Sequence, residues 1–361
     1  MSEAKEMTTE YKLPTPSRIK EFLDTHVIGQ EQAKKTIAVA IYNHYKRIIS
    51  NRTDIKKSNI LMIGPSGCGK TEIARAIAKI IGVPFCICDA TTVTQAGYVG
   101  DDVENMLLRL LQAADMDLNK AQCGIIYIDE IDKIARKGEN ASLTRDVSGE
   151  GVQQALLKIL EGSEVDLALT YGRKHPNAPD RVRFNTENVL FICGGAFEGL
   201  TMRKNEKNAI GFTKTILEDS TAIDRKDIVK QGIIPELIGR LPIITVLDEL
   251  TENDLKRILT EPKNAIIKQY NALLSLDGVK LIWDESVLTY IAKRAKDEGT
   301  GARGLRSIIE ETMTDLMFTV PDDDIKCDII VTVENNEIIC EKAKSKRTGS
   351  DNTLDPKRKI V

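Results

Sequence analysis

The sequence predicts an α/β fold in which helices cover both faces of a parallel sheet, followed by a smaller, mostly helical α+β domain. Short apolar runs of the kind found in buried strands alternate with amphipathic helical segments from residue 60 to residue 247. A glycine-rich turn joins the first of these strands to the helix that follows it. After residue 248 the alternation ends and helical segments predominate, which indicates a second domain.

The length of the chain agrees with this division, because 361 residues exceed what one ordinary hydrophobic core contains. We expect a larger domain at residues 14–248 and a smaller one at residues 249–342. The segments 1–13 and 343–361 are polar and lack periodicity, so we expect a disordered leader and a disordered tail.

The larger domain is expected to begin with two helices. Ser17 is a suitable cap for the first, with Ile19, Phe22 and Leu23 on its apolar stripe, and the second runs from residue 31 to about residue 50. Strands are then expected at 60–63, 84–88, 124–128, 188–193 and 243–247, and helices at 72–81, 102–117 and 152–160. Polar, glycine-containing stretches predict long loops at 137–150, 170–185 and 202–219.

The smaller domain begins with a helix-start pattern, because Thr251 and Asp254 have the spacing of a capping box. Helices are expected near 252–275, 285–297 and 303–318, and short strands at 279–283 and 328–333.

The composition excludes several classes of protein. Charged residues make up 29% of the chain and the net charge is only −3, which argues against general attraction to nucleic acid or anionic membranes. No apolar run approaches the roughly 20 residues of a membrane helix, and the N-terminus has no hydrophobic signal region. The seven cysteines are scattered without a C-x-x-C pair, so neither a disulfide framework nor a zinc module is indicated. We therefore expect a cytoplasmic protein.

The glycine-rich turn matches the phosphate-binding pattern G-x-x-x-x-G-K-S/T completely. Its residues are Gly64, Pro65, Ser66, Gly67, Cys68, Gly69, Lys70 and Thr71. Backbone N–H groups in such a turn surround phosphates at a helix N-terminus, where the helix dipole favours anions. Lys70 is expected to reach the β- and γ-phosphates and Thr71 to hold Mg²⁺, so the motif predicts a nucleoside triphosphate, ATP. Cys68 is either a reactive thiol among these amides or a small residue that fills the turn.

The strand expected at 124–128 ends in two adjacent carboxylates, Asp129 and Glu130. Downstream of a phosphate-binding loop this is a Walker B pattern. Asp129 is expected to bind Mg²⁺ through water, and Glu130 to act as the general base on the attacking water. A short apolar loop ahead of the first strand, at Val27 and Ile28, indicates either an adenine pocket or simple helix packing.

Several separated motifs resemble the AAA+ ATPases and, within them, the ClpX family of protein unfoldases. The resemblance covers about residues 14–342. The motifs that support it are residues 97–104, 144–154, 173–175, 210–212 and 301–306, together with an arginine after Gly239.

The resemblance implies a homohexameric ring with ATP bound between subunits. Arg240 then corresponds to the finger that reaches the γ-phosphate of a neighbouring subunit, and Arg303 to the sensor on the small domain of the nucleotide's own subunit. A guanidinium placed against the transferred phosphate stabilises the charge that spreads over its oxygens. Without the resemblance, Arg240 is an ordinary cation at a helix end.

The resemblance also assigns loops to protein substrates and to a peptidase partner. Tyr98 and Val99 correspond to the pore loop that grips tagged or unfolded polypeptides, and residues 148–151 to a second pore loop. The basic loop of Arg173, Lys174 and His175 suits acidic C-terminal carboxylates on substrate tags. Ile210, Gly211 and Phe212 correspond to the loop that docks into ClpP. Each assignment has an alternative. Tyr98 could instead anchor a turn, the basic loop could simply be solvated, and the apolar residues 210–212 could pack on the core of this protein.

Two departures from the family pattern stand out. ClpX proteins ordinarily carry a Cys-rich zinc-binding domain ahead of the ATPase domain, and no residues ahead of it here could bind zinc. The strand ending at Gly194 and Gly195 also lacks the Asn or Thr with which many AAA+ proteins orient water, so no sensor is assigned there.

Two other functions stay open. One is a remodelling chaperone that acts without a peptidase, against which only residues 210–212 argue. The other is a nucleic-acid motor, which the near-neutral charge and the aromatic pore loop disfavour.

Overall fold

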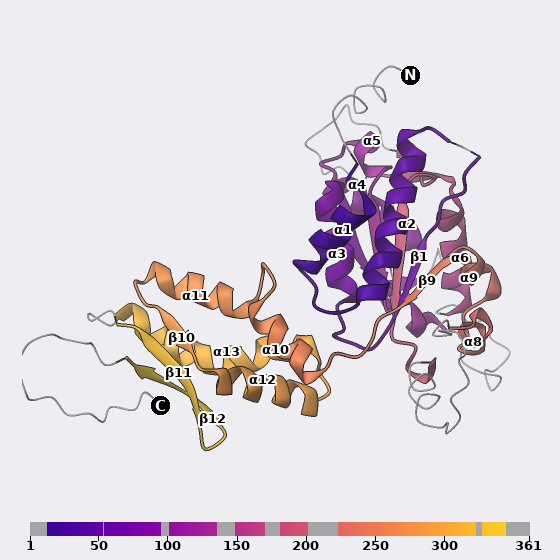
Figure 1. The fold of residues 1–361 in the computed structure, drawn as a ribbon. Helices are drawn as coiled ribbons and strands as arrows, with labels where there is room; N and C mark the ends of the chain where they lie inside the picture. The colour runs from indigo at the N-terminus through magenta and orange to yellow at the C-terminus, as the bar shows by residue number, and fades with distance from the viewer. Residues whose placement is uncertain are drawn as a thin grey trace, which may run out of the picture. The chain divides into compact units, whose positions relative to one another are not determined.

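A five-stranded parallel sheet in the order β2-β5-β8-β1-β9 lies at the centre of the first of two units (Figure 1). The computed structural model describes residues 13–52, 54–94, 101–135, 149–169, 181–200, 223–322 and 327–343. The first unit holds most of the described residues up to Asp248, and the second begins at Glu249 and includes the short segments Asp24–Gly29 and Ser66–Cys68.

The elements of the first unit alternate between strands and helices as the sequence predicts. The central strands are β1 (Ile60–Ile63), β2 (Phe85–Asp89), β5 (Ile125–Asp129), β8 (Leu190–Gly195) and β9 (Ile243–Val246). Two short pairs lie outside this sheet, β3 (Val93–Thr94) with β4 (Asp101–Asp102) and β6 (Glu164–Ala168) with β7 (Arg181–Asn185). The helices are α1 (Pro16–Asp24), α2 (Glu31–Ile49), α3 (Lys70–Ile81), α4 (Val103–Ala113), α5 (Leu118–Ala121), α6 (Glu150–Glu161), α8 (Arg225–Lys230) and α9 (Pro235–Gly239).

Strand residues alternate between the two faces of the central sheet, because side chains on a strand have a period of two. One set, which includes Ile126, Ile128 and Phe191, forms a buried cluster with residues of α4, α6 and α9. The alternate set, which includes Ile125 and Tyr127, is equally buried but lies on the other face. Helix α3 packs against β5 and β8, and none of its buried residues belongs to the first cluster, so α3 covers this second face.

Two local predictions in the first unit were wrong. Residues 181–185 were expected in a loop but form β7, whose pairing with β6 buries only Leu167 and Phe184 and leaves most other positions exposed. Such a hairpin has no continuous apolar run to reveal it. The first helix begins at Pro16, and the hydroxyl of Thr15, rather than Ser17, accepts a hydrogen bond from the Arg18 N–H (3.5 Å).

The second unit contains α10 (Glu252–Thr260), α11 (Ile266–Leu276), α12 (Glu285–Asp297) and α13 (Ala302–Thr319) around the sheet β10 (Leu281–Trp283), β11 (Ile329–Glu334) and β12 (Glu337–Lys342). The predicted capping box is confirmed, because the Thr251 hydroxyl accepts from the Asp254 N–H (3.1 Å) and an Asp254 carboxylate oxygen accepts from the Thr251 N–H (3.0 Å).

The second unit also differs from the prediction at two places. The helix expected at 252–275 is two helices, because Pro262 has no N–H to donate and its ring disfavours helical backbone before it. Strand β12 was not predicted. It follows a turn in which Asn335 and Asn336 both have positive φ (51° and 63°), as tight hairpin turns require.

A buried polar cluster holds the segment that leads into β8. The ring of His44 on α2 forms a hydrogen bond with the Asn188 carbonyl (3.1 Å), and Arg47 donates to the Glu187 carbonyl (3.1 Å). Lys57 donates to the Thr186 carbonyl (2.9 Å) with its ammonium 4.8 Å from the centre of the Phe191 ring. Burial, together with the charge of Arg47, lowers the pKa of His44 to about 3, and burial lowers the pKa of Lys57 to about 7.

We expect the first unit to lose stability between pH 7 and pH 5 because of His44. Its pKa is lower in the folded state, so the unfolded chain binds a proton near pH 6.5 that folded His44 does not bind until about pH 3. The contribution to stability is therefore complete above pH 6.5 and is lost as the pH falls toward 3. Over the interval from pH 7 to pH 5 this amounts to about 2 kcal/mol.

The measurement is calorimetric unfolding at pH 7, 6 and 5, compared between the wild type and His44→Gln. The glutamine amide can still donate to the Asn188 carbonyl but does not titrate, so the variant should have a flatter profile. Fluorescence of Trp283, the single tryptophan of the chain, follows the second unit separately. Equal slopes for the two proteins would contradict the prediction.

Candidate nucleotide-binding site

The phosphate-binding loop lies between β1 and α3, at the carboxyl end of β1. The Gly64 N–H donates to the Gly195 carbonyl (3.1 Å), which continues the pairing of β1 with β8 into the loop. Gly69 has φ 105°, a conformation that a residue with a Cβ rarely adopts. Helix α3 starts directly after it, so the first N–H groups of the helix face the position that a phosphate would take.

Lys70 is buried at the start of α3. Its ammonium donates to the Gly64 carbonyl (2.7 Å) and to the Pro65 carbonyl (2.9 Å). Both acceptors belong to the loop itself, so the charge predicted to reach the β- and γ-phosphates is held within the loop.

The Asp129 carboxylate at the end of β5 has three donors around it. The Thr71 hydroxyl donates to Oδ2 (3.2 Å), and the Tyr127 hydroxyl (3.0 Å) and the Glu130 N–H (3.0 Å) both donate to Oδ1. The structure therefore brings together Thr71 and Asp129, the two residues that the sequence proposes as magnesium ligands.

The chemistry of these two groups fits magnesium. Mg²⁺ prefers oxygen ligands and is usually bound by one or two protein groups, the phosphates of the nucleotide and several waters. A hydroxyl and a carboxylate 3.2 Å apart at the N-terminus of a helix supply such a partial set. Among the described residues, no group of three or more His, Cys, Asp and Glu side chains could hold a metal ion by itself.

Glu130 follows Asp129 in a left-handed backbone conformation, with φ 56° and ψ 36°. This turn breaks the alternation of the strand immediately after the sheet. The next carboxylate, Asp132, accepts a hydrogen bond from the Ala196 N–H (3.0 Å) and so connects the segment after β5 to the segment after β8.

Arg240 lies at the end of α9 and forms an ion pair with Glu161, the last residue of α6. The two side chains are 47% and 46% exposed, so water screens this pair. The backbone beneath it is held more firmly, because the buried Asn59 amide donates to the Leu160 carbonyl (3.2 Å) and to the Arg240 carbonyl (3.0 Å). Glu161 and Arg240 line a pocket of about 420 Å³ together with Arg47 and Lys57.

The other predicted site residues are placed as follows. Val27 and Ile28 lie in the segment between α1 and α2, and Cys68 lies in the turn between β1 and α3. Whether Cys68 is a reactive thiol or a residue that fills the turn stays a prediction. Arg303 is exposed in the first turn of α13. The residues assigned to substrates and to the peptidase lie outside the described residues: Tyr98, Val99, Arg173, Lys174, His175, Ile210, Gly211 and Phe212.

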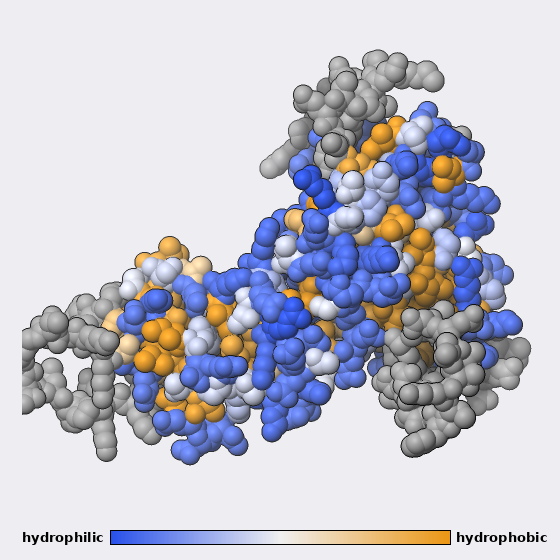
Figure 2. All heavy atoms as spheres, in the orientation of Figure 1, coloured by the Kyte–Doolittle hydropathy of each residue, from blue (hydrophilic) through white to orange (hydrophobic). Residues whose placement is uncertain are grey.

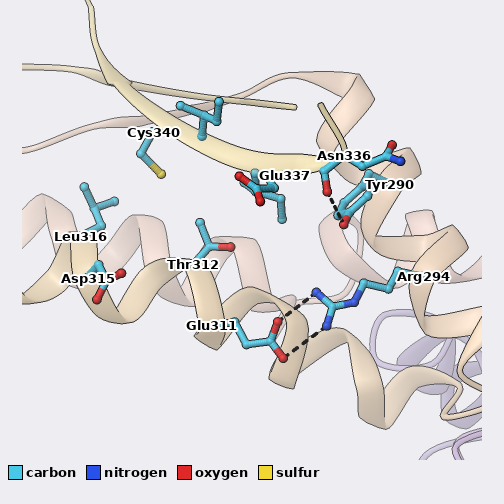
Figure 3. Close-up of a pocket in the computed structure, with 11 residues that line it drawn as sticks. Tyr290, Arg294, Glu311, Thr312, Asp315, Leu316, Asn336, Glu337 and Cys340 are labelled. Atoms are coloured by element: carbon cyan, nitrogen blue, oxygen red, sulfur yellow. Dashed lines mark hydrogen bonds and ion pairs between the residues drawn. The ribbon is translucent and has the colours of Figure 1, made fainter. Parts of the chain in front are cut away.

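A second pocket, of about 430 Å³, lies in the second unit between α12, α13 and β12 (Figure 3). Two pairs of its polar groups contact each other. The Tyr290 hydroxyl donates to the Asn336 carbonyl (2.7 Å), and Arg294 forms an ion pair with Glu311 (2.9 Å). We assign no chemistry to this pocket.

Sequence reasoning missed two residues next to the predicted site, Tyr127 and Glu161. The signal for Tyr127 was available, because a residue two positions before Asp129 on a strand shares its face. Glu161 gave no such signal, since its partner Arg240 is distant in the sequence and no regular spacing relates them.

The described residues contain no helix with the length and apolar character needed to cross a membrane.

Comparison with family models matches two consecutive segments. The model of the AAA domain (Cdc48 subfamily) matches residues 55–244, and the model of the C-terminal, D2-small domain of ClpB protein matches residues 250–325. An AAA domain followed by a small, mostly helical domain confirms the predicted fold class.

Three similar curated proteins share one name, ATP-dependent Clp protease ATP-binding subunit ClpX. The protein from Treponema denticola is 55% identical over 324 residues, which are 86% of this chain and 78% of that protein. The protein from Bacteroides thetaiotaomicron is 50% identical over 350 residues, 93% of this chain and 84% of that protein. The one from Borrelia duttonii is 48% identical over 337 residues, 90% of this chain and 78% of that protein.

Proposed function

The chain belongs to the ClpX family of AAA+ ATPases, and on this basis we propose that it uses ATP to unfold tagged proteins, moves them through a hexameric pore and delivers them to the ClpP peptidase. The relatives are named as subunits of a Clp protease, which supports the delivery step. The ATPase activity itself follows from the family.

The observation that carries the chemical part of the proposal is the contact between Thr71 and Asp129 at the N-terminus of α3 (3.2 Å). In our proposal the loop amides and Lys70 bind the phosphates, and Thr71 and Asp129 hold Mg²⁺. The bound ion neutralises charge on the β- and γ-phosphates. Glu130 takes the proton of the attacking water as general base.

Two arginines complete the proposed site. Arg240 of one subunit stabilises the γ-phosphate bound by its neighbour, and Arg303 acts on the nucleotide of its own subunit. The ion pair with Glu161 gives Arg240 a carboxylate partner within the chain, which a nucleotide of a neighbouring subunit would replace. In this exchange the phosphate of the nucleotide replaces the Glu161 carboxylate, so the Arg240 guanidinium keeps an anionic partner throughout.

Assembly into a ring is supported by the surface of the second unit. Hydrophobic residues gather on its visible face (Figure 2). Two large apolar side chains of this unit are mostly exposed, Leu276 on α11 (84%) and Phe318 on α13 (80%). Apolar side chains of this size at the surface are common where proteins associate.

We propose that the loops outside the described residues handle the protein partners. Tyr98 and Val99 would grip the translocating chain, and Arg173, Lys174 and His175 would attract carboxylates at the ring entrance. Ile210, Gly211 and Phe212 would dock into ClpP. A peptidase-independent chaperone remains the second candidate, and the same experiment separates the two.

The experiment measures ATP-dependent degradation of a folded, tagged protein with and without ClpP, for the wild type and for Phe212→Ala. We expect degradation only with ATP and ClpP together. Burial of one Phe side chain on a partner contributes about 1.5–3 kcal/mol, and a ring presents several such loops at once. The variant should therefore need at least about tenfold more ClpP for half-maximal degradation.

The matched control is Thr213→Ala, which removes a neighbouring polar side chain of the same loop and should leave the requirement for ClpP unchanged. ATP hydrolysis and the thermal melt of Phe212→Ala should equal those of the wild type. A melt lowered by several degrees would place Phe212 in the core of this protein. Unfolding without any ClpP-dependent degradation would favour the chaperone.

A further inference from the structure

Tyr127 combines complete burial with a polar contact at the proposed catalytic centre. Tyr127 is the middle residue of β5, and its side chain is 0% exposed. Its hydroxyl nevertheless donates a hydrogen bond to Asp129 Oδ1 (3.0 Å). A buried hydroxyl requires a hydrogen-bond partner, because the loss of water is otherwise uncompensated. Tyr127 and Asp129 are two residues apart on one strand, so both lie on the face that α3 covers.

The neighbouring strand is shaped to admit this ring. Tyr127 pairs with Ile192 on β8, and Gly194 follows two residues later on the same face. A Cβ at Gly194 would overlap the Tyr127 hydroxyl and would lie 2.9 Å from the Cζ of the ring. The absence of a side chain at Gly194 is therefore what allows the hydroxyl to reach the carboxylate.

The two carboxylate oxygens of Asp129 have different hydrogen-bond partners. Oδ1 accepts from Tyr127 and from the Glu130 N–H, and Oδ2 lies 3.2 Å from the Thr71 hydroxyl. The terminal torsion of an Asp side chain is broad and roughly two-fold, so a carboxylate held at one oxygen by a single N–H can rotate. Two donors on Oδ1 fix the plane of the carboxylate and direct Oδ2 toward Thr71.

We propose that Tyr127 is a positioning residue that orients Asp129 for the magnesium ion of bound nucleotide, with Gly194 providing the space for it. The inference rests on the proposed role of Asp129 in holding Mg²⁺. Groups that hydrogen-bond to a metal-binding carboxylate typically change metal affinity or activity by 10–100-fold when removed. Tyr127 touches neither the nucleotide nor the ion and acts through Asp129.

The test is Tyr127→Phe, which keeps the ring and removes only the hydroxyl. Binding of a fluorescent ATP analogue is measured while Mg²⁺ is titrated, and again in EDTA. The variant should require at least about tenfold more Mg²⁺ for half-maximal Mg²⁺-dependent binding. Binding in EDTA and the thermal melt should change little, and saturating Mg²⁺ should restore most of the ATP hydrolysis.

The matched control is Tyr45→Phe, which removes the hydroxyl of another buried tyrosine of the same unit. That hydroxyl donates to the Cys123 carbonyl (3.1 Å), which lies just before β5, whereas Asp129 is the last residue of β5. It should leave the Mg²⁺ dependence unchanged. Gly194→Ala, which displaces the ring and keeps the hydroxyl, should shift the Mg²⁺ dependence in the same direction as Tyr127→Phe.

An unchanged Mg²⁺ requirement in Tyr127→Phe would overturn the inference, and so would an equal shift in Tyr45→Phe. Either result leaves the proposed function intact if the wild type degrades tagged proteins with ATP and ClpP. Absence of Mg²⁺-dependent nucleotide binding in the wild type would instead contradict the proposed function itself.

Discussion

Replacement of Glu130 by glutamine is expected to reduce ATP hydrolysis by at least about 100-fold while ATP binding and ring assembly persist. The amide keeps the size of the side chain but cannot accept the proton of the attacking water, and a positioned general base typically contributes 10²–10⁴-fold. Asp129, Thr71 and Lys70 keep their contacts, because the Glu130 backbone rather than its side chain donates to Asp129. Hydrolysis is measured by phosphate release, and binding by titration with a fluorescent ATP analogue.

The control for this change is Glu164→Gln on β6, an exposed position in the two-stranded sheet of β6 and β7, which is separate from the sheet of β5. It removes one negative charge from the same unit and should leave both activities unchanged. If Glu130→Gln retains more than about a tenth of wild-type hydrolysis, another group is the base.

Replacement of Arg240 by alanine is expected to reduce ATP hydrolysis by about 10³-fold or more, with ATP binding retained. The guanidinium would act on charge that develops during phosphoryl transfer, so its loss should change turnover more than affinity. Lysine at this position keeps the charge but loses the planar pair of donors, and Arg240→Lys should recover only part of the rate.

Two measurements distinguish a catalytic Arg240 from a structural one. Glu161→Gln removes the ion pair within the chain and leaves Arg240 in place, so hydrolysis should remain near the wild-type rate. Mixed rings of Arg240→Ala and Glu130→Gln subunits should hydrolyse ATP faster than either variant alone, because some sites then receive an intact Glu130 and a neighbour's Arg240. Loss of activity in Glu161→Gln, without recovery in mixed rings, would show that Arg240 supports the fold instead.

The parts of the fold that the sequence predicted well are those with an unambiguous apolar pattern. The predicted strand at 60–63 and the predicted helix at 285–297 coincide with β1 and α12. The hairpin of β6 and β7 was missed because its pairing buries so few side chains. Charged residues such as Arg183 and Glu164, which form an ion pair across the two strands (3.6 Å), are as typical of a loop as of a strand. The strand order was not predictable, since all five central strands are similar apolar runs.

The candidate site could be predicted as far as its chemistry depends on adjacent residues. The loop 64–71 and the pair Asp129 and Glu130 are recognisable because each motif is continuous in the sequence. Contacts between strands could not be read from adjacent residues in this way. The proximity of Thr71 to Asp129 had to be inferred from the two motifs. The space that Gly194 leaves for Tyr127 depends on the order and register of the strands. An aromatic residue within an apolar run is predicted to be a core residue without a polar role, and for this reason Tyr127 was overlooked.

The left-handed backbone of Glu130 has a consequence for attempts to make this protein more heat-resistant. At φ 56° and ψ 36° a residue with a Cβ is less stable than glycine by roughly 1–2 kcal/mol. Glycine is therefore the residue that would stabilise the backbone at position 130 most, but replacement of Glu130 by glycine removes the carboxylate. Screening variants for melting temperature alone would favour an inert protein, so turnover has to be scored in the same screen.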